Sequence, residues 1–191
     1  MFRSLFLAAS VLGLAAPSPA AERWAFDKAH TQVLFTVDHL GFTELTGQFR
    51  VVEGELLLDR EDLTRSSVRA TIRADSVDMN DDRLNAHLRN ADFFDVENHP
   101  ALEFVSTAVE RVGEDALKLH GELTMLGRAL PVVLDVKINQ IGSHPFRGTP
   151  YAGFTATGRL DRTAWGMGYL AGRIGTDIGI RINLEAAPVQ E

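Results

Sequence analysis

Residues 24–52, WAFDKAHTQVLFTVDHLGFTELTGQFRVV, decide the fold of this chain. In their first half the odd positions are mostly apolar, as at Phe35 and Val37, while the even positions are mostly polar. The same alternation returns after Gly41 and runs through Phe49. Alternation with a period of two predicts half-buried strands, here joined by a glycine corner. Because a hairpin alone is only marginally stable in water, other segments must supply strands that share its apolar face.

Later segments repeat the pattern, and one of them departs from it. Strands are predicted over residues 55–59, 67–76, 102–108, 117–125, 130–138, 151–161 and 175–186. Residues 80–90 predict the one helix instead, because Asp81 and Asp82 suit a helix start and Leu84 and Leu88 stand four apart.

This count of eight or nine strands and one helix predicts an all-β domain, either a closed barrel or a sandwich. We favour an antiparallel eight-stranded β-barrel with the α-helix in a connection, since such a barrel can hold one small ligand. The helix would then cover one end.

Composition narrows the class of protein. The chain has 191 residues, of which 45% are apolar, and its net charge of -7 includes no basic run. One globular domain is expected, with no nucleic-acid partner, because phosphate binding needs clustered lysine and arginine. Residues 1–20 have the charged start, apolar middle and small-residue end of a signal peptide, which predicts export and a mature domain over residues 21–191. With no cysteine, the chain can form no disulfide.

Motifs for chemistry are missing from the sequence. There is no nucleophile elbow, no thiol and no glycine-rich phosphate loop, so no catalytic residue is predicted. The six histidines include no close-spaced ligand pair, and His30 and His39 fall on opposite strand faces, so no metal site or cofactor is predicted. A binding protein is therefore favoured over an enzyme.

Aromatic side chains are the most informative set. They are Phe35, Phe49, Phe93, Phe94, Phe104, Phe154 and Trp165. They fit an ordinary filled core, and they fit equally a lined cavity for an apolar ligand. Periodicity does not separate these two interpretations.

Five ordered blocks of the sequence resemble the YceI-like family. They are residues 30–41 with 46–49, residues 76–104 with the run ADFFD, residues 121–132, residues 153–166, and residues 175–178. The resemblance covers nearly all of the chain after residue 20. It departs from the family pattern at Leu126, Ala129 and Leu130, and at Trp165, where a phenylalanine is usual.

The resemblance implies a lipocalin-like, extended barrel in the periplasm that binds a polyisoprenoid, an isoprenoid quinone or another long-chain amphiphilic lipid. The ligand-binding side chains would then be Val33, Phe35, Val37, Phe49, Phe104, Leu119, Leu134, Phe154 and Ile180, with Phe93 and Phe94 closing one end, His39 or Arg89 at the headgroup, and Trp165 reshaping the cavity. Two alternatives stay open: an enzyme that acts on such a lipid through His39 or His87, and a packed structural or interaction module without a ligand. A homodimer is compatible with the sequence, although no feature requires one.

Overall fold

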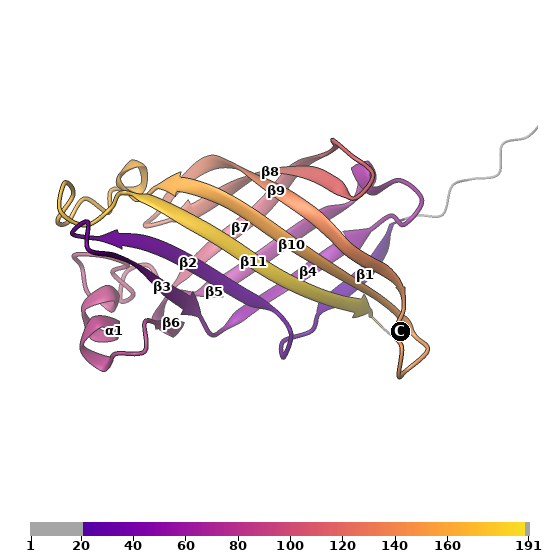
Figure 1. Cartoon of the computed structure of the whole chain (residues 1–191), viewed down its shortest axis with the longest axis horizontal. Helices are drawn as coiled ribbons and strands as arrows, with labels where there is room; N and C mark the ends of the chain where they lie inside the picture. Colours follow the sequence, from indigo (N-terminus) through magenta and orange to yellow (C-terminus); the bar gives the residue numbers. More distant parts are fainter. Residues whose placement is uncertain (1–20, 190–191) are drawn as a thin grey trace, which may run out of the picture.

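The computed structural model describes residues 21–189, and Figure 1 shows a cylinder of long tilted strands with a helix at one end. The strands are β1 (Glu22–Phe26), β2 (Gln32–His39), β3 (Thr43–Phe49), β4 (Val52–Leu58), β5 (Ser67–Arg73), β6 (Val77–Asp78), β7 (Ala101–Arg111), β8 (Ala116–Met125), β9 (Arg128–Ser143), β10 (Pro150–Asp161) and β11 (Asp177–Pro188). The helices are α1 (Asp82–Arg89) and the short 3-10 turns η1 (Leu63–Arg65), η2 (Ala74–Ser76) and η3 (Arg162–Trp165). The predicted signal peptide lies outside the described residues.

Eight of the strands close into an antiparallel ring. Its order is β1, β4, β5, β7, β8, β9, β10 and β11, and it closes because β11 also pairs with β1. The predicted eight-stranded barrel with a helix in a connection is therefore confirmed. Strands β2, β3 and β6 continue the sheet outward from β11, so β11 changes partner along its length, from β2 at residues 179–183 to β1 at residues 186–188.

The predicted count of eight or nine strands is wrong, because the described residues form eleven. The segment that contains Trp24 is a strand of its own, separated from β2 by a turn at residues 27–30. There the Asp27 carboxylate accepts a hydrogen bond from the Ala29 N–H, and the Asp27 carbonyl accepts one from the His30 N–H. This turn uses neither glycine nor proline, and Asp27 is its one turn-forming residue, too weak a signal to separate β1 from β2 in the sequence. β6 has only two residues, too few to show a period.

Buried side chains form two clusters. One contains Phe49, Phe94 and Trp165, and lies toward the end of the barrel that carries α1. The second contains Trp24 and Phe154, and Trp24 is fully buried between its partners on β4 and β11. These clusters anchor the two ends of the barrel.

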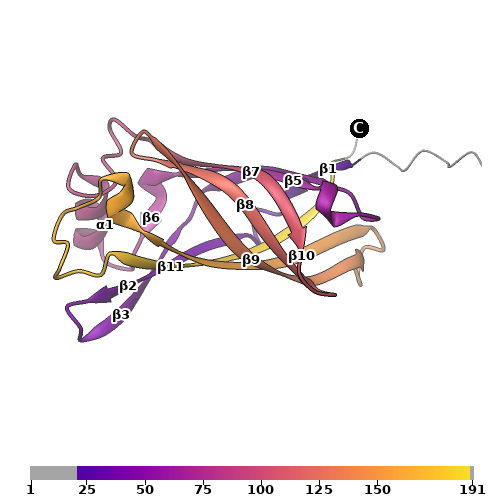
Figure 2. The same ribbon diagram turned by 90° about the horizontal axis from the view of Figure 1, so that it is seen from above.

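The two ends of the barrel are covered by different elements of the chain. At the helix end, α1 begins as predicted, with the Asp81 carboxylate accepting hydrogen bonds from the N–H groups of Arg83 and Leu84. Figure 2 shows α1, the β2–β3 turn and the loop before β11 at this same end.

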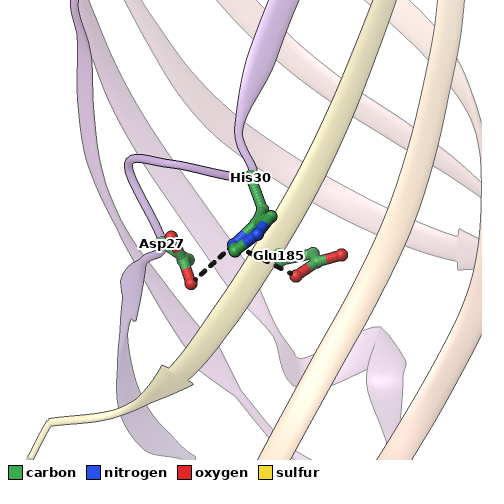
Figure 3. A group of neighbouring side chains, drawn as sticks. All are labelled: Asp27, His30 and Glu185. Atoms are coloured by element: carbon green, nitrogen blue, oxygen red, sulfur yellow. Dashed lines mark ion pairs between the residues drawn. The ribbon is translucent and has the colours of Figure 1, made fainter.

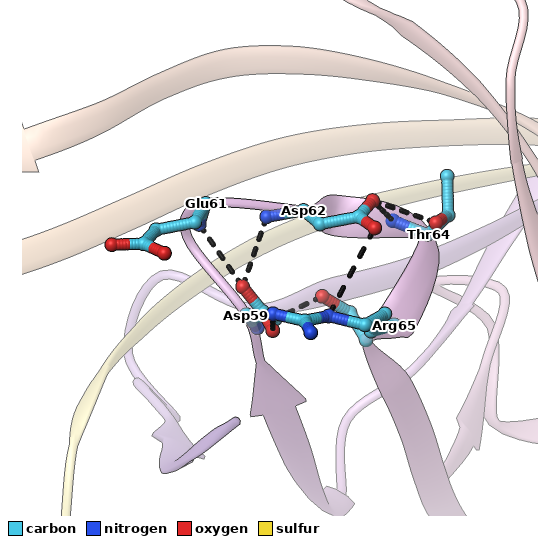
Figure 4. A network of polar contacts seen from close by, with 6 residues as sticks. Asp59, Glu61, Asp62, Thr64 and Arg65 are labelled. Carbon is cyan, nitrogen blue, oxygen red and sulfur yellow. Dashed lines mark hydrogen bonds and ion pairs between the residues drawn. The ribbon is translucent and has the colours of Figure 1, made fainter. Parts of the chain in front are cut away.

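At the opposite end, residues 59–66 connect β4 to β5 (Figure 4). The buried Asp59 carboxylate accepts from the Glu61 and Asp62 N–H groups and pairs with Arg65. These bonds fix η1, whose Leu63 side chain is buried.

Candidate functional site

The barrel interior is hollow. A cavity of about 390 Å³ lies inside it, lined by side chains from all eight strands of the ring, together with β2, β3 and α1. The lining is almost wholly aliphatic and aromatic, because each strand turns one face inward and those faces carry the apolar residues. Its volume is in the range of known small-ligand sites. The interior is therefore not completely filled by side chains.

Twelve of the fourteen side chains predicted to bind ligand line this cavity. They are Val33, Phe35, Val37, His39, Phe49, Phe93, Phe94, Phe104, Leu119, Leu134, Phe154 and Ile180. Most come from strands whose alternation fixed the inward face. Phe93 and Phe94 follow α1, and the Phe94 ring meets the Phe49 ring edge to face at 5.4 Å.

The other two predicted residues lie outside the lining. Arg89 is in the last turn of α1, where its Nε donates a hydrogen bond to the Asp75 carbonyl. Trp165 is buried, and its Nε1 donates to the Leu123 carbonyl at 2.9 Å, so the indole is held against β8. Neither side chain is among those that border the cavity.

The cavity residues that come from connections could not be predicted from the sequence. Leu63 borders it at the η1 end, and Arg162, Met167, Leu170 and Ile174 border it at the helix end. These residues belong to no long periodic segment, so their inward orientation depends on the tertiary fold. Apart from Arg162, which is charged, their only signal was apolar character between two predicted strands.

Two cavity rings lie against glycines of the neighbouring strand. Phe35 is paired with Gly47 across β2 and β3, and a Cβ added at Gly47 would lie 2.3 Å from the Phe35 Cζ. A Cβ at Gly121 on β8 would lie 2.4 Å from the Phe104 Cζ. Since both contacts are closer than van der Waals packing permits, each ring uses the space left by the missing side chain. The Phe35 and Phe104 rings therefore lie along the barrel wall, and the centre of the cavity stays open.

Gly47→Ala should therefore cost about 1–3 kcal/mol in the free energy of unfolding, because Phe35 and Met79 must shift to admit the methyl group. Gly153→Ala is the matched control, since a Cβ there meets only the Asn139 Cβ at 3.9 Å. Urea denaturation of both variants measures the difference. Equal stability of the two would show that the ring does not depend on the glycine.

A polar cluster lies outside the cavity, where β11 changes partner (Figure 3). The His30 Nδ1 is 3.0 Å from an Asp27 carboxylate oxygen and 3.7 Å from one of Glu185. The Tyr151 hydroxyl donates to the same Asp27 oxygen at 2.6 Å. Asp27, His30 and Glu185 place three donor atoms within 4.8 Å of one another, so among residues 21–189 they are the side chains that could hold a metal ion. Together with the Tyr151 hydrogen bond, their contacts already join the turn after β1 to β10 and β11.

Electrostatics in this cluster favour ionised Asp27. The Tyr151 hydrogen bond, followed by that of His30, lowers the pKa of Asp27 from 3.8 to about 2. Asp27 in turn raises the pKa of His30 above 6.5 through a hydrogen bond. The pKa of the Tyr151 hydroxyl is also raised, first by burial and then by its bonds to the two carboxylates.

Tyr151→Phe should lower the free energy of unfolding at neutral pH by about 1–2 kcal/mol, because the half-buried Asp27 carboxylate loses a hydrogen-bond donor. The folded pKa of Asp27 lies below its ordinary value, so this stabilisation is present above pH 3.8 and is lost as the pH falls toward about 2. The difference in the free energy of unfolding between Tyr151→Phe and the parent should therefore become smaller as the pH falls through this range. Unfolding by urea across this range measures both effects.

Tyr169→Phe is the control, because Tyr169 is 40% exposed at the helix end and touches His87 and Phe93 only through its ring. A pH-independent difference between Tyr151→Phe and the parent would contradict the assigned hydrogen bond.

The model of the YceI-like domain matches residues 24–186. The chain belongs to the YceI-like family. This YceI-like chain is 34% identical over 183 residues to the UPF0312 protein of Serratia proteamaculans, with 95% of this chain and 94% of that protein covered. The resemblance found in the sequence is confirmed.

Solved structures share the fold of the YceI-like chain. BcnA of Burkholderia cenocepacia superposes with a TM-score of 0.76 at 23% identity, covering 85% of this chain and 99% of BcnA. A polyisoprenoid binding domain from Saccharophagus degradans superposes with a TM-score of 0.60 at 16% identity, covering 90% and 100%. Within residues 21–189 of the YceI-like chain, no helix has the length and apolar character needed to cross a bilayer.

Proposed function

We propose that this protein binds one long-chain isoprenoid or other amphiphilic lipid inside its barrel, and carries, stores or sequesters it in the periplasm. The observation that carries the proposal is the cavity, whose lining is almost wholly apolar. An empty apolar cavity inside a barrel lowers stability, and an apolar ligand would fill it. The bound chain would lie along the barrel axis.

The energetics suit a chain-like ligand. Each buried CH₂ contributes roughly 0.8 kcal/mol, so several isoprene units would supply a useful affinity after the ordering cost is subtracted. The ligand would contact the twelve predicted side chains that border the cavity, and Phe93 and Phe94 would close it at the helix end. His39 borders the cavity and would meet a polar headgroup.

The family and its neighbours support this function. The structural neighbour from Saccharophagus degradans is named as a polyisoprenoid binding domain. Residues 1–20 carry the signal-peptide pattern that supports export to the periplasm. The proposal requires binding alone, with no chemical step on the lipid.

Native mass spectrometry of the exported protein tests the proposal. We expect a mass above that of the polypeptide, and solvent extraction should release one isoprenoid or long-chain lipid per protein. The apo form should also take up polyprenols or isoprenoid quinones when incubated with them. A clean apo mass that stays unchanged with every such lipid would overturn the proposal.

A further inference from the structure

A buried arginine borders the cavity at the helix end. Arg162 is the first residue of η3, its relative exposure is 3%, and it is one of the few charged residues in the cavity lining. Arg159, the other arginine there, differs because it is exposed and paired with Asp177 at 2.8 Å. Arg162 therefore brings a positive charge into an apolar environment.

Backbone carbonyls hold the Arg162 guanidinium. Its Nε donates to the Gly175 carbonyl at 2.9 Å, one terminal nitrogen donates to Met167 at 2.6 Å, and the other donates to Ile174 at 3.2 Å. A guanidinium has five N–H donors, and these three bonds use three of them. One N–H on each terminal nitrogen is left for another acceptor.

The charge of Arg162 has no counterion in the protein. Over residues 21–189, no carboxylate forms an ion pair with it. The preceding Asp161 is engaged elsewhere, since its carboxylate accepts from the N–H and the hydroxyl of Thr163. Burial accordingly lowers the pKa of Arg162, with Asp161 opposing this only through its charge. A buried cation without an anion is costly, and carbonyl dipoles satisfy its hydrogen bonds without neutralising it.

We infer that Arg162 receives the anionic headgroup, a carboxylate or a phosphate, of the lipid held in the cavity. This inference rests on the proposed function and adds the chemistry of the headgroup. The two free N–H groups suit two oxygens of one anion, and a guanidinium binds carboxylate and phosphate in this bidentate manner. Met167 and Ile174, which accept from Arg162, border the same cavity, so the headgroup would lie at the helix end with its chain along the bore.

The test compares lipids that share one alkyl chain and differ in the headgroup. Palmitate, hexadecyl phosphate, methyl palmitate and hexadecanol are titrated into delipidated protein, with displacement of a fluorescent fatty-acid probe as the readout. We expect palmitate or hexadecyl phosphate to bind about tenfold or more tightly than the ester and the alcohol. The affinities of the two anions show which of the two headgroups the site prefers.

Two substitutions assign the preference to Arg162. Arg162→Gln should remove it while the ester and alcohol still bind, and Arg162→Lys should restore part of it because the charge is kept. Arg128→Gln is the matched control, since Arg128 also donates to a carbonyl of η3, that of Ala164, but is exposed and outside the cavity lining. It should leave the preference intact.

The outcomes separate this inference from the proposed function. Equal binding of all four lipids by the unmodified protein would overturn the headgroup inference and leave the carrier function in place. Arg162 would then serve only to hold residues 167–175 in position. This comparison needs no variant, so it holds even where Arg162→Gln fails to fold. Binding of none of these lipids, nor of polyprenols or quinones, would overturn the proposed function and the inference together.

Discussion

Phe35→Asp should reduce lipid affinity at least about 100-fold while the barrel stays folded. Phe35 lies on β2, borders the cavity, and packs 5.7 Å from the Phe49 ring, centroid to centroid. A carboxylate there must lose its water when an apolar chain enters, and this desolvation cost opposes binding. The measurement is the lipid retained after purification and the affinity for added polyprenol.

Thr36→Asp is the control for this substitution. Thr36 is the next residue of β2 and is not among the residues that border the cavity. It introduces the same charge in the same strand, and lipid binding should be retained. Comparable loss in both variants, or normal lipid content in folded Phe35→Asp, would refute the assigned position of the ligand.

Trp24→Ala should cost about 3–5 kcal/mol in the free energy of unfolding, the largest stability effect we expect from one residue. The side chain is fully buried among apolar residues that include Leu58 and Phe154, and its removal leaves a cavity. Trp24→Phe should cost much less, for two reasons. It retains most of the ring, and it removes an indole N–H that has no hydrogen-bond partner.

Denaturant unfolding of both variants, beside Phe42→Ala, measures this difference. Phe42 is 88% exposed in the β2–β3 turn, so its truncation should change stability by no more than about 0.5 kcal/mol. A Trp24→Phe variant as unstable as Trp24→Ala would show that the indole N–H is hydrogen-bonded in the folded protein.

The inward faces of the long strands could be predicted from the sequence, and the ends of the cavity could not. Val33, Leu134 and Ile180 were found because a period of two assigns each side chain to a face once one face is known to be buried. Met167 and Ile174 lie in a connection without periodicity. Their positions depend on the hydrogen bonds that their backbone carbonyls accept from the Arg162 side chain. Such bonds join residues that only the folded chain brings together.

Residue type alone did not predict that the side chains of Arg89 and Trp165 lie outside the cavity lining. A cation on the helix and a large ring in a family block both suit a lipid site, but residue type does not fix direction. Arg89 turns to the Asp75 carbonyl, and Trp165 turns its N–H to the Leu123 carbonyl. The Arg89 guanidinium and the Trp165 indole N–H each need an acceptor, and these backbone carbonyls supply one. This requirement, and not contact with a ligand, sets where the two side chains point.

Because β11 changes partner along its length, we expect the strands of the barrel to separate in a defined order. β1 closes the ring through Trp24, Ala25 and Phe26 alone, whereas β10 stays paired with β11 from Ala152 to Asp161. Segments with few cross-strand bonds open first, so amide protons of β1 should exchange with solvent before those of β8, β9 and β10. Once β1 separates, the ring becomes a curved open sheet with its apolar face exposed to water. A lipid that touches both sides of this seam would oppose the separation, and slower hydrogen exchange in β1 would be the first sign that the barrel is occupied.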